Sequence, residues 1–295
     1  MRFCKIESEV FSLKHTRRSL RTVIALGAAA ALTPVALLAP GGMTRRQRAP
    51  FQGVNFAHRG LHSRDKTVPE NSLEAFELAA RAGYGIELDV QLSRDGQVVV
   101  FHDDTLKRVC GVDKRVDEVD YAALRQLKLE GQNTGVPLFS EVLEVIRGRG
   151  PLLVELKTGR RNRELCEKTY ALLETYRGDV CIESFNPFIV AWFRFHAPDL
   201  VRGQLAMPAA YYAGATHPAQ AFLLSRCLFN AIARPQFIAY RIGRRPPAVR
   251  FAELLGAMKV GWTSHEPRNE KGRDAVIFEF YKPGITYRTG RSARA

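Results

Sequence analysis

Two pairs of charged side chains stand where apolar runs of this chain end. In GIELDVQL, residues 85–92, Glu87 and Asp89 lie two positions apart, and in LLVELK, residues 152–157, so do Glu155 and Lys157. Because alternate residues of a strand project to the same side, each pair shares one face. Three carboxylates from two strands would repel one another unless a cation lay between them. Oxygen ligands without a Cys or His pattern favour Mg²⁺ or Ca²⁺ over zinc, so Glu87, Asp89 and Glu155 predict a site for one divalent metal ion.

Two histidines end other apolar runs. His58 follows VNFA and precedes Arg59, whereas His102 follows VVVF and precedes Asp103 and Asp104. A lone histidine on an apolar strand is more often a satisfied core residue. Two at strand ends, each beside a charged group, suit a general acid and a general base, because a histidine titrates near neutral pH. We interpret Asp103 and Asp104 as supporting or capping groups rather than as metal ligands.

Fixed positive charge stands beside both kinds of site. Arg59 and Lys157 could hold the charge of a phosphate while one of its ester oxygens leaves. The competing interpretation is that each strand-end carboxylate merely pairs with an arginine at the surface. That interpretation suits any one of them alone, but it fits the joint pattern of carboxylates and histidines poorly.

Strand-like runs alternate with amphipathic segments after residue 50, which favours parallel strands and an α/β architecture. We count the third run as a β-hairpin insertion after strand 2, so eight strand units remain, the number that closes a (β/α)₈ TIM barrel. A doubly wound open sheet is the alternative, but no glycine-rich phosphate loop follows the first strand. The expected strands are 54–58, 85–92, 98–102, 152–157, 180–185, 202–207, 237–242, 259–264 and 275–280.

The first fifty residues differ from the rest. They carry nine Lys/Arg against two Glu, which is half of the net charge of +14, and residues 22–40 form an uncharged apolar run. As a helix this run would measure roughly 28 Å, about the thickness of a bilayer core. We therefore expect residues 1–50 to be a basic segment with an apolar membrane helix and a linker, and residues 51–295 to be the catalytic barrel. A cleaved signal or a soluble extension is the alternative.

The charge pattern also bears on partners and location. Six Lys/Arg precede the apolar run and three follow it, which favours a cytoplasmic amino terminus and a barrel outside the cytoplasm, anchored to the cell membrane by one span. Secretion after cleavage and a cytoplasmic protein are the alternatives. No nucleic-acid-binding motif is present, so the basic charge points to lipid headgroups rather than to nucleic acid.

The chain resembles the glycerophosphodiester phosphodiesterases, in particular bacterial members with an amino-terminal apolar segment. The resemblance covers about 225 residues in family order. The matching motifs are FAHRG (56–60), PENS (69–72), IELDV (86–90), DGQVVVFHDDTLKRVCG (95–111), PLLVELK (151–157), IESFNP (182–187), RGQLAM (202–207) and AVIFEF (275–280). It implies a (β/α)₈ barrel with one divalent metal ion that hydrolyses a small-molecule glycerophosphodiester to sn-glycerol 3-phosphate and an alcohol.

The resemblance also implies roles for individual residues. His58 and His102 would be the acid–base pair, Glu87, Asp89 and Glu155 the metal ligands, and Arg59 and Lys157 the phosphate-binding pair. Phe185 and Trp262 would contact the glycerol moiety, and Glu70 and Asn71 would support the site. The alternative for the last two is a helix start that Asn71 caps.

The sequence departs from the family pattern near its end. The motif that begins with Trp262 continues as TSHEPRNEKGRD, and the connection from Ser264 to Asp274 is short enough that we expect a turn rather than a helix. We set His265 aside as a solvated loop residue. These departures bear on substrate choice more than on chemistry. The alternatives are a lysophospholipase D-like or sphingomyelinase D-like phosphodiesterase and a membrane-tethered phosphodiester-binding protein without activity.

Overall fold

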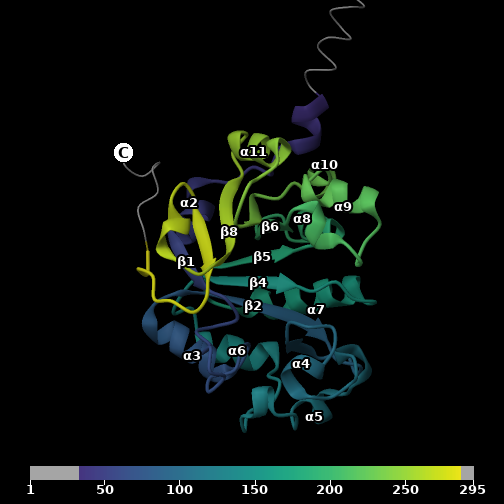
Figure 1. Ribbon diagram of the computed structural model, residues 1–295, viewed down its shortest axis with the longest axis vertical. Coiled ribbons are helices and arrows are strands. Elements are labelled where there is room, and N and C mark those ends of the chain that lie inside the picture. The colour runs from purple at the N-terminus through teal and green to yellow at the C-terminus, as the bar shows by residue number, and fades with distance from the viewer. Residues whose placement is uncertain (1–32, 287–295) are drawn as a thin grey trace, which may run out of the picture.

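The computed structural model describes residues 33–286, and its centre is a closed barrel of eight parallel strands (Figure 1). Each strand pairs with the next one around the barrel, and β1 pairs with both β9 and β2, which closes the ring. The predicted TIM barrel is confirmed, and each strand starts within one residue of the expected position. The barrel strands are β1 Val54–Ala57, β2 Gly85–Leu92, β4 Leu152–Leu156, β5 Val180–Ser184, β6 Val201–Ala206, β7 Phe237–Arg241, β8 Met258–Ser264 and β9 Ala275–Phe278.

The insertion after β2 is also as expected. Strand β3, Val98–Val100, runs antiparallel to β2, with Val100 opposite Val90. The chain after β3 forms a small lobe with an apolar cluster of its own, at the lower edge of Figure 1, where α4 and α5 are labelled. Its short elements are α4 Lys107–Cys110, η2 Val116–Glu118, α5 Tyr121–Leu124 and η3 Leu129–Gly131.

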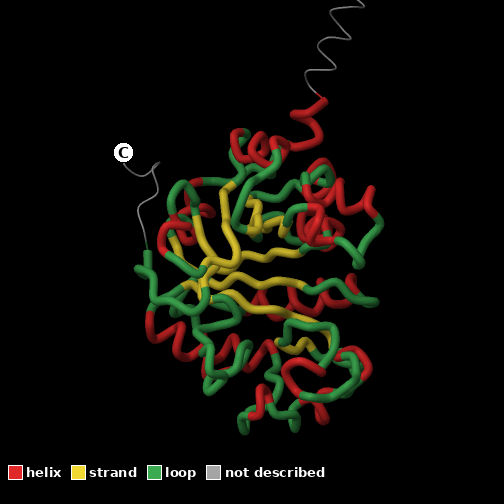
Figure 2. The backbone as a smooth tube through the Cα atoms, viewed as in Figure 1, coloured by secondary structure: helices red, strands yellow, loops and turns green. Residues whose placement is uncertain are grey.

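Helices surround the strands, as Figure 2 shows in red around yellow. Helices α3 and α6 contact each other, and α7 contacts α8. Between β8 and β9 the chain forms only η5, Pro267–Glu270, which confirms the expected turn. The other elements are α3 Leu73–Ala82, α6 Phe139–Ile146, α7 Asn162–Thr175, α8 Pro187–His196, η4 Ala209–Tyr212, α9 Pro218–Ser225, α10 Asn230–Ala233 and α11 Pro247–Leu254.

Both faces of the barrel strands are buried: one packs against the helices and the other faces the barrel interior, where some of the side chains are charged. On β2, Ile86, Leu88 and Val90 belong to the apolar cluster that packs beneath α3, α6 and α7. The intervening Glu87 and Asp89 therefore project to the opposite face, into the barrel. Toward the amino ends of the strands the interior is apolar, so the polar positions gather at the carboxyl ends, where TIM barrels assemble their sites. The interior cluster includes Phe56, Leu153, Phe237, Met258 and Ile277.

The predicted membrane helix, residues 22–40, lies largely outside the described residues. Within residues 33–286 no helix is long and apolar enough to cross a bilayer. The end of the apolar run meets the barrel instead: Leu38 is buried, Arg234 donates to the Ala39 carbonyl at 2.9 Å, and the Gly41 amide donates to Pro235 at 3.1 Å. Burial on protein, which the run's apolar composition equally permits, accounts for this end. Residues 22–32 lie outside the described part. Before β1 the chain forms α2, Arg45–Arg48, and η1, Ala49–Phe51. The predicted domain boundary at residue 50 falls within η1 and stays a prediction.

Candidate active site

Three carboxylates converge at the carboxyl ends of β2 and β4. Glu87, Asp89 and Glu155 are buried, and each offers an oxygen within 4.8 Å of the other two. The strand register explains this, because Asp89 lies opposite Glu155 in the β2–β4 pairing. The three predicted metal ligands are therefore brought together.

Two cations adjoin this triad, as the sequence predicted. Lys157 Nζ lies 2.7 Å from Glu155 Oε1 and 3.4 Å from Asp89 Oδ1. Arg59 Nε lies 3.5 Å from Asp89 Oδ2, and the Arg59 amide donates to Glu87 Oε2 at 2.8 Å. The cations partly balance the charge of the three carboxylates.

The pKa shifts of the three carboxyl groups indicate that Arg59 and Lys157 do not fully balance their negative charge. Burial, and then the charges of Asp89 and Glu155, hold the pKa of Glu87 well above its usual range. Burial also raises the pKa of Glu155 against the opposing charge of Lys157. Burial resists ionisation of Asp89 as well, but Lys157, His102 and Arg59 lower its pKa, and its buried Oδ1 accepts no hydrogen bond. A divalent cation fits these residues, because hard oxygen ligands gather there with charge and acceptor capacity unused.

The turn after β1 positions Arg59. Arg59 has a left-handed backbone with φ 55°, and Gly60 follows with φ 79°. A Cβ at Gly60 would lie 2.8 Å from Ala75 in α3, so only glycine lets the turn approach the helix this closely. The turn thereby directs the Arg59 amide and guanidinium to the carboxylates.

His58 lies beside a carboxylate that the sequence analysis overlooked. Its Nδ1 is 2.8 Å from Glu279 Oε2, just beyond β9. His62 Nε2 lies 3.5 Å and His265 Nε2 3.8 Å from the same carboxylate, and the His265 side chain is 57% exposed. Burial and then the charge of Arg59 lower the pKa of His58 to about 4, while Glu279 partly offsets them. His58 is therefore neutral at pH 7.

His102 has a similar arrangement. Its Nδ1 lies 2.6 Å from Asp103 Oδ1, and Arg108 Nε donates to Asp103 Oδ2 at 2.6 Å. Asp103 is thus the supporting group that the sequence suggested. Asp104 is exposed and lies 3.7 Å from Arg115. Both predicted catalytic histidines consequently have one ring nitrogen beside a carboxylate, which orients the ring.

Glu70 and Asn71 support the site from behind. Glu70 accepts hydrogen bonds from Arg59 at 2.7 Å and from both terminal nitrogens of Arg108. It therefore links Arg59, which follows His58, to Arg108, which binds the Asp103 carboxylate beside His102. Asn71 Nδ2 donates to Asp89 Oδ2 at 2.9 Å. The alternative that Asn71 caps a helix is wrong, because the side chain of Ser72 caps α3 by accepting from the Ala75 amide.

A cavity of about 470 Å³ opens over these groups, lined by both histidines and by Phe185 and Trp262. The rings of Phe185 and Trp262 meet edge to face at 5.5 Å, and Trp262 Nε1 donates to the Ala239 carbonyl at 2.9 Å. One wall of the cavity is thus charged and the opposite wall is aromatic.

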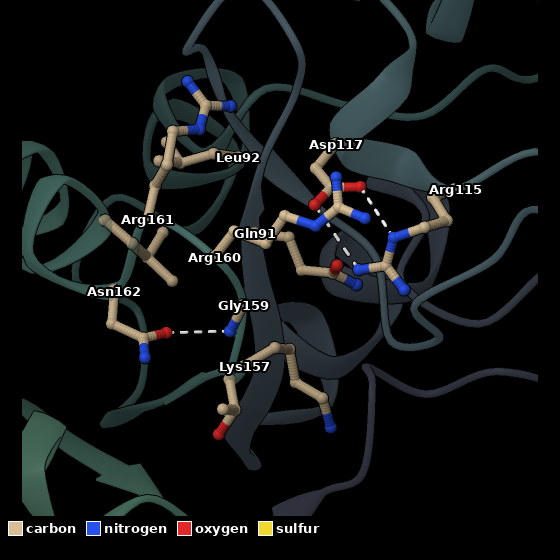
Figure 3. Close-up of a pocket in the computed structure, with 11 residues that line it drawn as sticks. Gln91, Leu92, Arg115, Asp117, Lys157, Gly159, Arg160, Arg161 and Asn162 are labelled. Atoms are coloured by element: carbon tan, nitrogen blue, oxygen red, sulfur yellow. Dashed lines mark hydrogen bonds and ion pairs between the residues drawn. The ribbon is translucent and has the colours of Figure 1, made fainter.

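The loop after β4 begins with Lys157. Figure 3 shows Lys157 extending away from Arg160 and Arg161, while the Gly159 amide donates to Asn162 Oδ1 at 2.7 Å. Nearby, Arg115 donates to Asp117 at 2.9 Å. These contacts order the loop beside the active site and leave the amine of Lys157 with the carboxylates.

Glu183 is a further buried acid that the sequence analysis did not assign. It lies opposite Glu155 in the β4–β5 register, and its Oε2 has no hydrogen-bond partner. Burial, and then the charges of Glu155 and Glu87, hold its pKa well above the usual range. The sequence contained a signal for this position. Glu183 stands two positions before Phe185 near the end of a predicted strand, just as Glu155 stands two positions before Lys157, so its side chain could be expected to project into the barrel.

Comparisons with known proteins identify the family of the chain. The model of the Glycerophosphoryl diester phosphodiesterase family matches residues 58–280. A glycerophosphodiester phosphodiesterase of Bacillus altitudinis is 34% identical over 52% of this chain and 66% of its own length. A lysophospholipase D of Mus musculus is 31% identical over 47% of this chain and 46% of its own. The chain thus spans between about half and two thirds of these two relatives.

Solved structures show the same fold. A phosphodiesterase from Oleispira antarctica, in complex with the product sn-glycerol-3-phosphate, superposes with a TM-score of 0.64 at 24% identity, over 78% of this chain and 94% of that one. A glycerophosphodiester phosphodiesterase from Parabacteroides distasonis gives a TM-score of 0.59 at 21% identity, over 77% and 93%.

Proposed function

The chain belongs to the glycerophosphoryl diester phosphodiesterase family, and from this premise we propose that it hydrolyses glycerophosphodiesters to sn-glycerol 3-phosphate and an alcohol. The observation that carries the proposal is one cavity lined by Arg59, by carboxylates of the triad and by both histidines. Asp89 and Lys157 complete the cluster of charges beside it. A site that only bound a phosphodiester would need the cations but neither histidine.

Each residue then has a task in the reaction. Arg59 and Lys157 hold the non-bridging phosphoryl oxygens. Glu87, Asp89 and Glu155 would hold the divalent cation, Mg²⁺ or Ca²⁺, which when bound supplies further positive charge to the phosphate. His58, neutral because of its burial, accepts the proton of the attacking hydroxyl, and His102 donates a proton to the departing alkoxide. Phe185 and Trp262 offer apolar contact to the carbons of glycerol.

The attacking hydroxyl belongs either to water or to the neighbouring glycerol carbon. In the second case a cyclic glycerol phosphate forms first, and ³¹P NMR of the reaction mixture would detect it. Glu70 and Asn71 act indirectly, since they hold Arg59 and Asp89 in place.

The experiment is a metal-supplemented assay of the purified chain on a panel of glycerophosphodiesters. We expect sn-glycerol 3-phosphate to form, to be lost on chelation, and to return when Mg²⁺ or Ca²⁺ is added back. A folded protein that forms no product with any divalent cation contradicts the proposal. The same assay on a chain that starts near Pro50 tests whether the preceding segment is dispensable.

An apolar cavity favours a second candidate, a lysophospholipase D-like activity. It measures about 380 Å³ and shares Phe185 and Met207 with the catalytic cavity. Apolar side chains of α8 and α9 line it, and Phe188 at its edge is 61% exposed. An acyl chain on the glycerol could lie there. Turnover of lysophospholipids in detergent that exceeds turnover of the deacylated diesters would favour this candidate.

We propose membrane association as a separate property. The support is the uncharged run of residues 22–40 and the basic residues before it, and the charge balance favours a barrel outside the cytoplasm. Fractionation of cells that express the full chain, followed by protease treatment of spheroplasts, tests this. Recovery of the full chain in the cytosolic fraction contradicts it.

A further inference from the structure

The cavity has a side to which the proposed reaction assigns few roles. This is the side formed by the ends of β5 to β8, whereas catalytic groups fill the side of β1, β2 and β4. Both organic arms of a bound diester must therefore extend over β5 to β8. The wall there is formed by Phe185, Leu205, Met207, Tyr211, Arg241 and Trp262.

Arg241 is the basic residue of this wall, to which β5 also contributes the buried acid Glu183. It ends β7, and its guanidinium carbon lies 4.2 Å from the ring centre of Tyr211 and 5.9 Å from that of Trp262. Among residues 33–286 no carboxylate pairs with it, although most arginines near the site have such a partner. A half-buried guanidinium stacked on aromatic rings keeps its hydrogen-bond donors for a ligand.

The same stacking bears on head groups of opposite charge. Aromatic faces that line a cavity can bind a quaternary ammonium group such as choline. Here the guanidinium already lies over these faces, so a second cation would meet a like charge. A carboxylate or phosphate oxygen would instead find a planar group that binds such anions through two parallel hydrogen bonds.

On the basis of the proposed function, we propose that Arg241 binds an anionic group on the leaving alcohol, so that the preferred substrates are glycerophosphodiesters with a carboxylate or a second phosphate in the head group. The glycerol arm offers only hydroxyl groups and needs no unpaired guanidinium. The unpaired charge of Arg241 therefore points to the other arm.

The experiment uses three glycerophosphodiesters whose head groups have similar size and different charge: choline, its uncharged analogue 3,3-dimethylbutanol, and 4-hydroxybutyrate. We expect kcat/KM of the full-length, metal-supplied protein to be about tenfold or more higher for the carboxylate than for choline. Added salt should reduce this ratio, because it screens the interaction.

The variants separate head-group binding from other roles of Arg241. In R241Q the ratio of the carboxylate to the choline substrate should fall toward one, whereas R244Q, which alters an exposed arginine three residues later, should keep the wild-type ratio. An equal loss of kcat/KM on all three substrates in R241Q overturns the inference and indicates that Arg241 contacts the glycerol arm. A preference of the wild-type protein for the choline substrate also overturns the inference. Absence of turnover with all three, in protein whose circular dichroism shows it folded, overturns the proposed function and this inference with it.

Discussion

His58 Nδ1 and Glu279 Oε2 lie 2.8 Å apart, although 221 residues separate them in sequence. The closure of the barrel produces this contact, because β1 and β9 are paired and His58 and Glu279 follow directly after Ala57 and Phe278, which lie opposite each other. The carboxylate fixes the ring so that Nε2 is left for the substrate, as in other histidine–carboxylate pairs.

The first prediction concerns this pair. Glu279→Gln should lower kcat by about 10²- to 10⁴-fold and change KM little, because the ring of His58 loses its preferred orientation. Since Glu279 raises the pKa of His58, its removal should also move the acid limb of the pH–rate profile to lower pH. Steady-state kinetics between pH 3 and 8 measure both effects.

The control for Glu279 is His265→Asn. This exposed ring lies 3.8 Å from Glu279 Oε1, and we expect its loss to change kcat less than threefold. Glu279→Asp should keep part of the activity, since the carboxylate is shortened but not neutralised. A Glu279→Gln enzyme with the wild-type rate and profile would show that the pair has no role in positioning.

The second prediction distinguishes the two histidines. If His102 protonates the leaving alkoxide, His102→Asn should cost much less with p-nitrophenol as the leaving group than with glycerol, because a nitrophenolate needs no proton. His58→Asn should cost a similar factor, about 10²-fold or more, with both substrates. The measurement is kcat/KM for both variants on both diesters, and the reverse pattern would exchange the two roles.

The third prediction concerns metal removal. Glu87 is buried with a raised pKa in the absence of a cation, so it must either ionise beside Asp89 and Glu155 or bind a proton, and both cost free energy at pH 8. Glu87→Gln should therefore stabilise the metal-free protein at pH 8 by about 1–3 kcal/mol. Wild-type protein should gain about 3 kcal/mol from a hundredfold excess of Mg²⁺ or Ca²⁺ over its Kd.

Glu87→Gln should thus raise the stability of the metal-free protein and reduce the stabilisation by the cation, so the order of wild type and variant reverses between the two conditions. Thermal unfolding with chelator should give the variant the higher Tm, and unfolding with the cation should give it to wild type. Ser140→Ala, an intermediate-exposure position on α6 away from the carboxylates, is a control that should respond to the cation as wild type does. Equal cation responses of wild type and Glu87→Gln would exclude Glu87 as a ligand.

Most of the barrel was predictable, because its information is local. The alternation of Ile86, Leu88 and Val90 with Glu87 and Asp89 reveals a strand with one apolar face and one charged end. Since parallel strands end at one rim, the side chains on β2 and β4 could be expected to meet without knowledge of the register.

The contacts that were missed depend on tertiary closure. A closed barrel implies that the last strand returns beside β1, but the sequence does not determine the register that places Glu279 beside His58. Arg108 belongs to an inserted lobe whose placement periodicity does not determine. The end of the apolar run could not be placed from the sequence for a related reason: an apolar segment can be buried by a barrel as well as by lipid, and the contact of Leu38 with the protein shows which applies there.

The fourth prediction concerns acid stability through Glu70. Burial opposes its ionisation, but hydrogen bonds and charges of Arg108 and Arg59 lower its pKa from 4.5 to about 2. A lowered carboxyl pKa stabilises the fold fully above the unfolded pKa, and this contribution is lost as pH falls from 4.5 toward 2. Because Arg108 is partly exposed, we expect Glu70→Gln to reduce the free energy of unfolding at pH 7 by about 2 kcal/mol.

The difference between wild type and Glu70→Gln should therefore narrow below pH 4.5 and nearly vanish near pH 2, as measured by urea unfolding at a series of pH values. Glu77→Gln is the matched control. Glu77 also pairs with two arginines, Arg81 and Arg149, but it does so at the surface, where salt screens the attraction. High salt should thus abolish any effect at Glu77 and leave most of that at Glu70. A difference at Glu70 that is independent of pH would mean that the carboxyl group acts by packing rather than by its charge.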